Sequence, residues 1–234
     1  MPKRSRAAAA VGILFILATV LFMVGDSIYG PILRSSDYLD RAFPESATVA
    51  AGVLIGLVGV LAIPLIAAFL FPVFKRESEA WAQSYVALRI IEAVLLTVVS
   101  ACALSVLNLS EAYLAGGADA PAQHAASATL QAIGEWSQIL SVGVVFPLGA
   151  IVLYSLLLRM RLVPRWIAHW GLWAAVLLLG GVLLDLLGLL SGIPDATLEF
   201  ILAGPIAVNE MVLAVWLIAR GFNEGKGTAK SAAV

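Results

Sequence analysis

The chain has 234 residues, of which 62% are hydrophobic and 12% are charged, and its mean hydropathy is +1.00. Soluble globular domains carry about 25% charged residues, so this composition excludes a soluble protein and indicates an integral membrane protein. The net charge of -1 argues against a nucleic-acid partner. One cysteine and two histidines far apart provide neither a disulfide framework nor a metal site, so we expect no cofactor.

Six hydrophobic stretches are long enough to cross a bilayer, which requires about 20 apolar residues per helix. We therefore predict an all-α, polytopic membrane protein in which a bundle of six transmembrane helices forms one membrane domain over residues 1–234. The predicted spans are residues 7–28, 47–71, 85–109, 126–158, 167–190 and 200–218. Residues 219–234 are rich in glycine and lysine, and we expect them to form a disordered cytoplasmic tail.

Lysine and arginine are distributed unevenly between the two sides of the six predicted spans. One side receives Lys3, Arg4, Arg6, Lys75, Arg76, Arg159, Arg161, Arg165, Arg220, Lys226 and Lys230. The other side receives only Arg34 and Arg41. Cytoplasmic loops carry the excess of basic residues in membrane proteins, so this distribution predicts that both termini are cytoplasmic.

Small residues line one face of several spans. Gly52, Gly56 and Gly59 share a face of the second span, and Gly181 lies on a similar face of the fifth. Small side chains at helical spacing allow the backbones of two helices to approach closely within a membrane. We therefore predict that these faces pack against other helices.

The third span contains an arginine and a glutamate one helical turn apart, Arg89 and Glu92. At about 100° per residue, they share a polar stripe of roughly 80° with Tyr85, Ser100 and Ala103. Ionisable side chains are costly in hydrocarbon and usually face the protein interior or a wet cavity. This stripe therefore requires a polar partner on another helix.

The sixth span offers that partner in Asn209 and Glu210. Glu210 shares a small-residue face with Ala203, Ala207 and Ala214, which predicts contact with another helix and not with lipid. At about 1.5 Å per residue, Glu92 lies roughly 12 Å and Glu210 roughly 15 Å from the cytoplasmic edge. We therefore predict a binding cluster in one layer, made of Arg89, Glu92, Asn209 and Glu210.

Three further acids lie near the opposite membrane face by the same count: Asp26, Glu135 and Asp185. A carboxylate near the membrane face reaches water more easily than one at the bilayer centre, so its charge costs less free energy there. We interpret them as an outer acidic rim, for which a binding role and ordinary hydration at the interface are the two alternatives.

Three interpretations of the inner cluster stay open. The cluster is a site for an ion, a proton or a polar head group, or it is a salt bridge that holds the bundle together. In the third interpretation, Arg89 simply extends to the cytoplasmic interface. An enzyme would need a nucleophile with its base, a metal cluster or acids beside a histidine within the membrane, and the sequence contains none of these patterns, which argues against catalysis.

Three segments resemble a known family: 88–93 (LRIIEA), 162–172 (LVPRWIAHWGL) and 208–222 (VNEMVLAVWLIARGF). In this order, on spans three, five and six, they are similar to the bacterial membrane-protein family catalogued as domain of unknown function 4386. The resemblance covers most of the chain up to Phe222. It implies a six-span bundle in a bacterial cytoplasmic membrane and places Arg89, Glu92, Asn209 and Glu210 at the family's recurring polar positions. It implies no activity.

The sequence thus leads to two functional hypotheses. One is a membrane protein that binds or transports a small polar or amphiphilic ligand or an ion at the Arg/Glu cluster. The other is a structural or regulatory membrane protein whose buried charges form a salt bridge. In both, the lipid bilayer is the one partner that the composition identifies.

Overall fold

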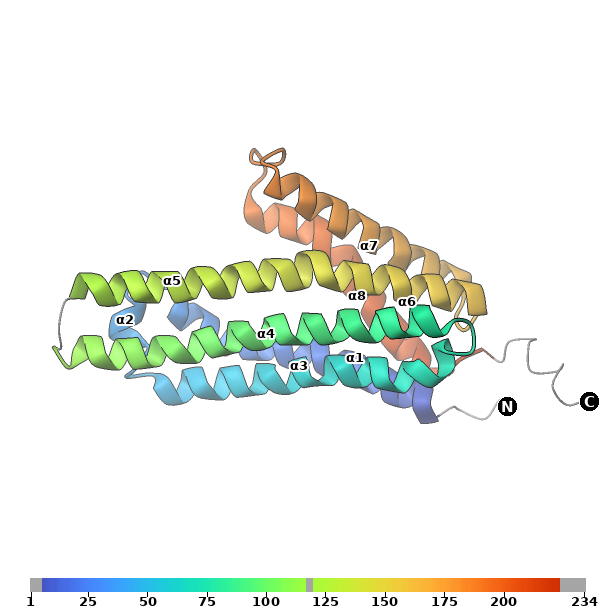
Figure 1. Ribbon diagram of the computed structural model, residues 1–234, viewed down its shortest axis with the longest axis horizontal. Coiled ribbons are helices and arrows are strands. Elements are labelled where there is room, and N and C mark those ends of the chain that lie inside the picture. The colour runs from blue at the N-terminus through green and yellow to red at the C-terminus, as the bar shows by residue number, and fades with distance from the viewer. Residues whose placement is uncertain (1–5, 117–119, 224–234) are drawn as a thin grey trace, which may run out of the picture. The chain divides into compact units, whose positions relative to one another are not determined.

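A computed structural model of the chain describes residues 6–116 and 120–223, and all regular elements within these ranges are helices. The elements in chain order are α1 (Arg6–Leu33), α2 (Tyr38–Arg41), α3 (Ser46–Phe74), α4 (Glu79–Leu114), α5 (Ala120–Gln138), the π-helix η1 (Ile139–Val145), α6 (Phe146–Met160), α7 (Arg165–Leu186) and α8 (Asp195–Ala219) (Figure 1). Of residues 219–234, for which we expect a disordered tail, residues 219–223 are described and residues 224–234 lie outside the described residues.

Among the described residues, six helical segments are long and apolar enough to cross a membrane: α1, α3, α4, the continuous helix from α5 through η1 to α6, α7, and most of α8. The predicted all-α fold with six membrane-spanning helices is therefore confirmed, and the protein is a multi-pass membrane protein. Helices satisfy all their backbone hydrogen bonds internally, which a segment in hydrocarbon requires. With 36 residues, α4 is about 54 Å long and extends beyond a hydrocarbon core of about 30 Å.

The helices form two compact units. Unit 1 consists of the described residues within Met1–Ile16, Pro64–Ile90 and Val142–Val234, and unit 2 consists of Leu17–Ile63 and the described residues within Ile91–Ser141. The three long helices α1, α3 and α4 each contribute a segment to both units.

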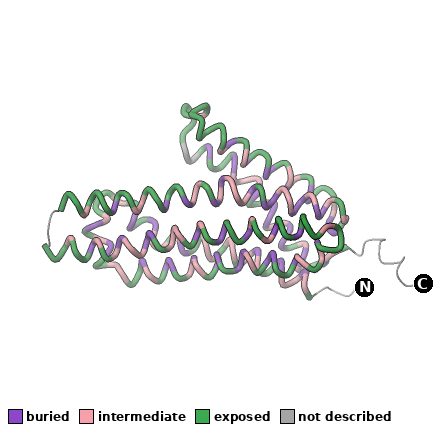
Figure 2. The backbone as a smooth tube through the Cα atoms, in the orientation of Figure 1, coloured by how far each residue is buried: buried purple, intermediate pink, exposed green. Residues whose placement is uncertain are grey.

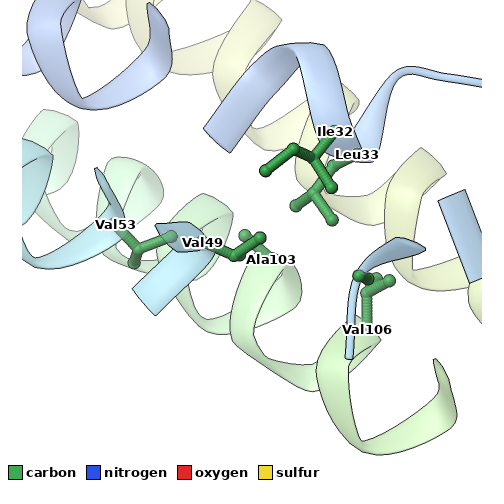
Figure 3. Packing of buried hydrophobic residues seen from close by; sticks show 7 residues of the cluster. Ile32, Leu33, Val49, Val53, Ala103 and Val106 are labelled. Atoms are coloured by element: carbon green, nitrogen blue, oxygen red, sulfur yellow. The ribbon is translucent and has the colours of Figure 1, made fainter. Parts of the chain in front are cut away.

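Unit 2 has a core of aliphatic side chains from α1, α3 and α4. Ile32, Leu33, Val49, Val53, Ala103 and Val106 pack together there (Figure 3). The short helix α2 is fixed to this core by the Ser110 hydroxyl, which accepts a hydrogen bond from the Phe43 N–H at 2.9 Å and donates one to the Leu39 carbonyl at 2.5 Å. One serine thus satisfies two backbone groups that a helix end leaves without partners.

Glycines bring α1 and α3 into backbone contact in unit 2. A Cβ atom on Gly25 would lie 2.6 Å from the Gly52 carbonyl oxygen and 2.7 Å from the Gly56 nitrogen. A Cβ atom on Gly59 would lie 2.8 Å from the Ala18 carbonyl oxygen. The small-residue face of the second span therefore packs against the first span, as the glycine spacing predicts.

In unit 1, α6 packs against α7, and α7 packs against α8. A side chain at Gly181 of α7 would overlap the Leu202 side chain of α8, so the predicted small-residue face is the α7–α8 contact. The opposite side of α7 is exposed along much of its length (Figure 2). Its exposed side chains include Trp173 and Leu183, and an apolar outer surface of this kind is suited to lipid.

The first prediction concerns the α1–α3 contact. Gly25→Ala should lower the free energy of unfolding in detergent by on the order of 1–3 kcal/mol, because the added methyl group meets backbone atoms that cannot rotate away. Gly180→Ala is the matched control, since nothing lies within 4 Å of a Cβ there and alanine favours the helix. Equal melting temperatures for the two variants would contradict the packing argument.

Candidate functional site

Arg89 on α4 is almost completely buried, with 2% of its surface exposed. Its Nε–H donates a hydrogen bond to the Tyr85 hydroxyl at 3.2 Å, one helical turn earlier. The guanidinium carbon also lies 5.3 Å from the ring centre of Tyr85 and 5.3 Å from that of Phe146. Aromatic faces attract cations, so these two rings replace part of the hydration that the guanidinium loses.

Phe146 reaches this position at the point where the helix changes geometry. The π-helix η1 ends at Val145, directly before Phe146 and Pro147. A π-helical turn holds more residues than an α-helical turn, so it changes the face on which the following side chains lie. Pro147 has no N–H to donate to the preceding turn, which explains why the irregularity occurs here.

Glu210 on α8 is the acidic partner of Arg89. Its Oε1 lies 3.8 Å from Arg89 Nη2, and only 7% of its surface is exposed. At 3.8 Å these two atoms form an ion pair but not a direct hydrogen bond. A buried ion pair is stable only when further polar groups satisfy its charges, so the surrounding side chains decide what this site can do.

Tyr154 on α6 is the first of these surrounding groups. It is completely buried, and its hydroxyl has no hydrogen-bond partner among the described residues. The hydroxyl is close enough to interact electrostatically with Glu210, Arg89 and Tyr85. The ring lies against Gly171 of α7, where any side chain would overlap it.

Asn209 directly precedes Glu210 on α8 and is also completely buried. Its side-chain N–H donates a hydrogen bond to the Ile167 carbonyl of α7 at 3.0 Å. Its side-chain oxygen has no hydrogen-bond partner within residues 6–116 and 120–223. Buried polar atoms nearly always have a partner, so an acceptor at Asn209 and a hydroxyl at Tyr154 require an explanation.

We call this arrangement the Arg89 site. It consists of Tyr85, Arg89, Phe146, Tyr154, Asn209 and Glu210, all in unit 1. Three of the four residues predicted for the inner cluster, namely Arg89, Asn209 and Glu210, thus lie in one unit. Phe146 and Tyr154 were not predicted, because an aromatic residue within an apolar span also fits ordinary packing and carries no signal of its own.

Glu92 is the fourth residue of the predicted cluster. It lies on α4 one turn after Arg89, is 4% exposed and belongs to unit 2. The Ser141 hydroxyl donates a hydrogen bond at 3.0 Å to the main-chain carbonyl of Glu92. Ser141 and Glu92 both belong to unit 2 and are buried. A binding role for Glu92 stays a prediction.

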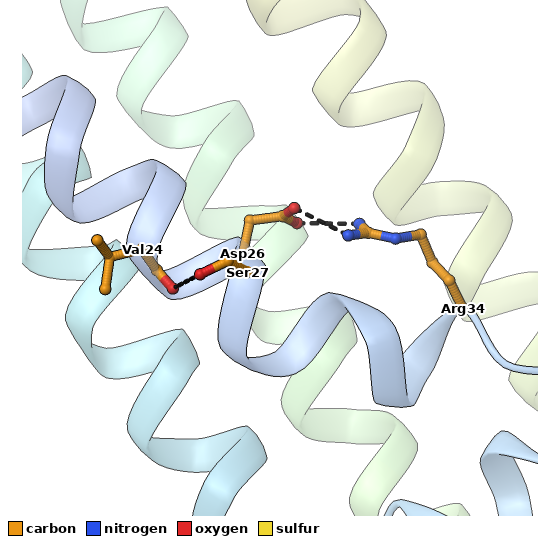
Figure 4. Close-up of polar contacts among 4 residues, drawn as sticks. All are labelled: Val24, Asp26, Ser27 and Arg34. Carbon is orange, nitrogen blue, oxygen red and sulfur yellow. Dashed lines mark hydrogen bonds and ion pairs between the residues drawn. The ribbon is translucent and has the colours of Figure 1, made fainter. Parts of the chain in front are cut away.

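Of the three acids of the predicted outer rim, Asp26 has a defined partner. Its two carboxylate oxygens accept hydrogen bonds from Arg34 at 3.0 and 2.9 Å, and the two residues lie about two turns apart (Figure 4). The guanidinium passes over Gly30, where a side chain would overlap it. Glu135 and Asp185 are exposed, in unit 2 and unit 1 respectively. The structure therefore gives Asp26 an ion pair and leaves a joint role of the three as a prediction.

Metal-ligating side chains do not gather in the described part of the chain. No group of three or more histidine, cysteine, aspartate or glutamate residues there has a geometry that could hold a metal ion. The polar groups of the Arg89 site are hydroxyl, amide, carboxylate and guanidinium groups.

The family described as domain of unknown function (DUF4386) matches residues 10–221. The chain belongs to this family. The match includes α1 from its fifth residue, the five other membrane-spanning helices and every residue of the Arg89 site, and it confirms the resemblance seen in the three sequence segments. No curated protein and no solved structure matches the chain.

The second prediction is a double-mutant cycle on the ion pair. Arg89→Gln should lower the free energy of unfolding by about 3 kcal/mol, because it leaves a buried carboxylate without its cation. Glu210→Gln should cost less, since Arg89 keeps the Tyr85 hydroxyl and two aromatic rings. The double variant should recover part of the loss of Arg89→Gln, because coupled residues are non-additive. Thermal unfolding in detergent measures all four proteins, and strictly additive losses would show that the two charges do not interact.

Proposed function

We propose that this protein binds a small polar or amphiphilic ligand at the Arg89 site. The observation that carries the proposal is that two buried atoms of unit 1, the Tyr154 hydroxyl and the Asn209 side-chain oxygen, have no hydrogen-bond partner among the described residues, and Asn209 directly precedes Glu210 of the buried ion pair. A structural salt bridge accounts for the charges alone. It does not account for two polar groups that are buried at a cost of about 1–3 kcal/mol each.

The chemistry of these groups defines the class of ligand. The Tyr154 hydroxyl can donate to an acceptor on the ligand, and the Asn209 oxygen can accept from a donor. Arg89 attracts an anionic group and Glu210 attracts a cationic group. A small ligand or head group that carries both a donor and an acceptor therefore fits the site better than a simple monatomic ion.

A structural role is the second candidate, and one observation favours it. Arg89 of α4 contacts Phe146 of α6 and Glu210 of α8, so the same side chain ties three helices of unit 1 together. Such ties specify how helices pack even where they add little stability. The two candidates differ in what they predict for Tyr154. Its hydroxyl has no hydrogen-bond partner among the described residues and therefore joins no helices.

The third prediction uses this difference. Tyr154→Phe should leave the melting temperature in detergent unchanged or raise it, because the removed hydroxyl has no hydrogen-bond partner within the described part of the chain. It should nevertheless weaken ligand binding about tenfold, the scale of one lost hydrogen bond of roughly 1.4 kcal/mol. Native mass spectrometry of the purified protein detects a co-purified small molecule and measures its retention.

Two variants serve as controls. Tyr85→Phe removes a hydroxyl that accepts a hydrogen bond from Arg89, so it should lower the melting temperature. Tyr113→Phe changes a tyrosine of unit 2 that contacts His124 and should alter neither property. Two outcomes would favour the structural role. In the first, wild type and Tyr154→Phe retain a bound molecule equally. In the second, the wild type carries no bound molecule and polar amphiphiles do not raise its melting temperature.

We further infer that the protein resides in a bacterial cytoplasmic membrane with both termini in the cytoplasm. The support is the family membership together with eleven basic residues on one side of the six spans and two on the other. In this orientation the connection between α3 and α4 is cytoplasmic, and the start of α5 is outside.

The fourth prediction tests this orientation by cysteine labelling. In a Cys102→Ser background, Ala125→Cys should react with a membrane-impermeant maleimide added to intact cells, whereas Glu77→Cys should react only after lysis. Both positions are exposed, and Cys102, the one natural cysteine, is buried. Labelling of Glu77→Cys from outside would reverse the proposed topology.

A further inference from the structure

A second feature of α8 lies on its outer surface. A shallow, widely open groove of about 410 Å³ follows α8 from Val208 to Arg220, and its lining is almost entirely apolar and comes from α8 alone. The lining residues recur every three or four positions, so they form one face of the helix. Val208 and Val215 within it are 54% and 59% exposed. The groove is therefore a surface open to the membrane and separate from the inward-facing Arg89 site.

The length of the groove corresponds to one leaflet of a bilayer. Twelve residues separate Val208 from Arg220, which gives about 18 Å along the helix axis. Half of a hydrocarbon core of about 30 Å is roughly 15 Å. A single acyl chain that lies along α8 would therefore end at the level of Arg220.

The end of the groove carries a fixed positive charge. Arg220 is exposed, and its guanidinium carbon lies 5.9 Å from the ring centre of Trp216, which also lines the groove. The Trp216 ring thus holds the charge over the groove end by a cation–π contact. Arg220 follows the last residue of α8, where a lipid head group would lie.

The neighbouring connection adds further basic residues at the same end of unit 1. Gly221 adopts a left-handed conformation with φ 74°, which turns the chain after α8. The Asn223 N–H then donates a hydrogen bond to the Leu162 carbonyl at 2.7 Å, in the connection from α6 to α7. Arg161 and Arg165 lie in or directly after that connection. Anionic head groups are attracted to such basic clusters.

We propose that this groove binds one anionic phospholipid, with an acyl chain along α8 and the phosphate on Arg220. A second copy of the chain in the same orientation fits less well, because the Arg220 side chains of both copies would lie at the same membrane level, where like charges repel. The lipid site does not depend on the ligand proposed for the Arg89 site, since Asn209 and Glu210 are buried while Val208 and Val215 are exposed.

The fifth prediction tests the lipid site by native mass spectrometry of the protein in dodecyl maltoside, titrated with dioleoylphosphatidylglycerol or dioleoylphosphatidylcholine. The wild type should bind one phosphatidylglycerol more tightly than phosphatidylcholine. Arg220→Gln should weaken phosphatidylglycerol binding about fivefold, the factor that corresponds to about 1 kcal/mol. Val215→Trp should fill the groove and weaken the binding of both lipids.

Matched controls separate this site from general attraction. Arg165→Gln removes a charge near the same connection, and Val176→Trp enlarges an exposed valine of α7 that does not line the groove. Arg165→Gln should change lipid binding less than Arg220→Gln, and Val176→Trp should change it less than Val215→Trp. Val208→Trp provides a second groove-filling variant if Val215→Trp does not fold, and melting temperatures verify folding.

Three outcomes would overturn the proposal. An equal loss with Arg220→Gln and Arg165→Gln would mean diffuse attraction without a defined head-group position. Unchanged lipid binding in both groove-filling variants would place the acyl chain elsewhere. A wild-type dimer that becomes a monomer in the groove-filling variants would show that a second copy covers this face of α8.

Discussion

The burial of the Arg89 charge is the constraint on which the rest of unit 1 depends. A guanidinium that is 2% exposed within apolar helices must be surrounded by groups that replace water. Here the Tyr85 hydroxyl, two aromatic rings and the Glu210 carboxylate do so, from α4, α6 and α8. The positions of these three helices are therefore coupled through one side chain, and a change at any of them alters how the charge is stabilised.

Close packing at glycines makes these polar contacts possible. Within a membrane the hydrophobic effect contributes little to the association of helices, so backbones must approach closely to gain dispersion contacts. Gly171 accommodates the Tyr154 ring against α7, and Gly181 accommodates Leu202 of α8. The same principle joins α1 and α3 in unit 2 at Gly25 and Gly52. The buried position of Tyr154 in the Arg89 site thus depends on a small residue at position 171.

The helix α8 presents two chemically distinct faces. Its buried face contributes Asn209 and Glu210 to the Arg89 site, and its exposed face forms an apolar groove that ends at Arg220. Met211 of the groove follows directly after Glu210. If both proposed sites are occupied, a lipid on the outer face and a polar ligand on the inner face contact the same helix.

The sequence by itself determined the number of membrane spans, because hydrophobic length and the absence of charge act locally along each helix. It also placed Arg89 and Glu210 on inward faces, since an ionisable side chain has no stable position in lipid. Only the tertiary structure decided which groups surround them. Phe146 depends on a π-helical turn and Tyr154 on a glycine of another helix, and such contacts between distant segments leave no periodic signal in the chain.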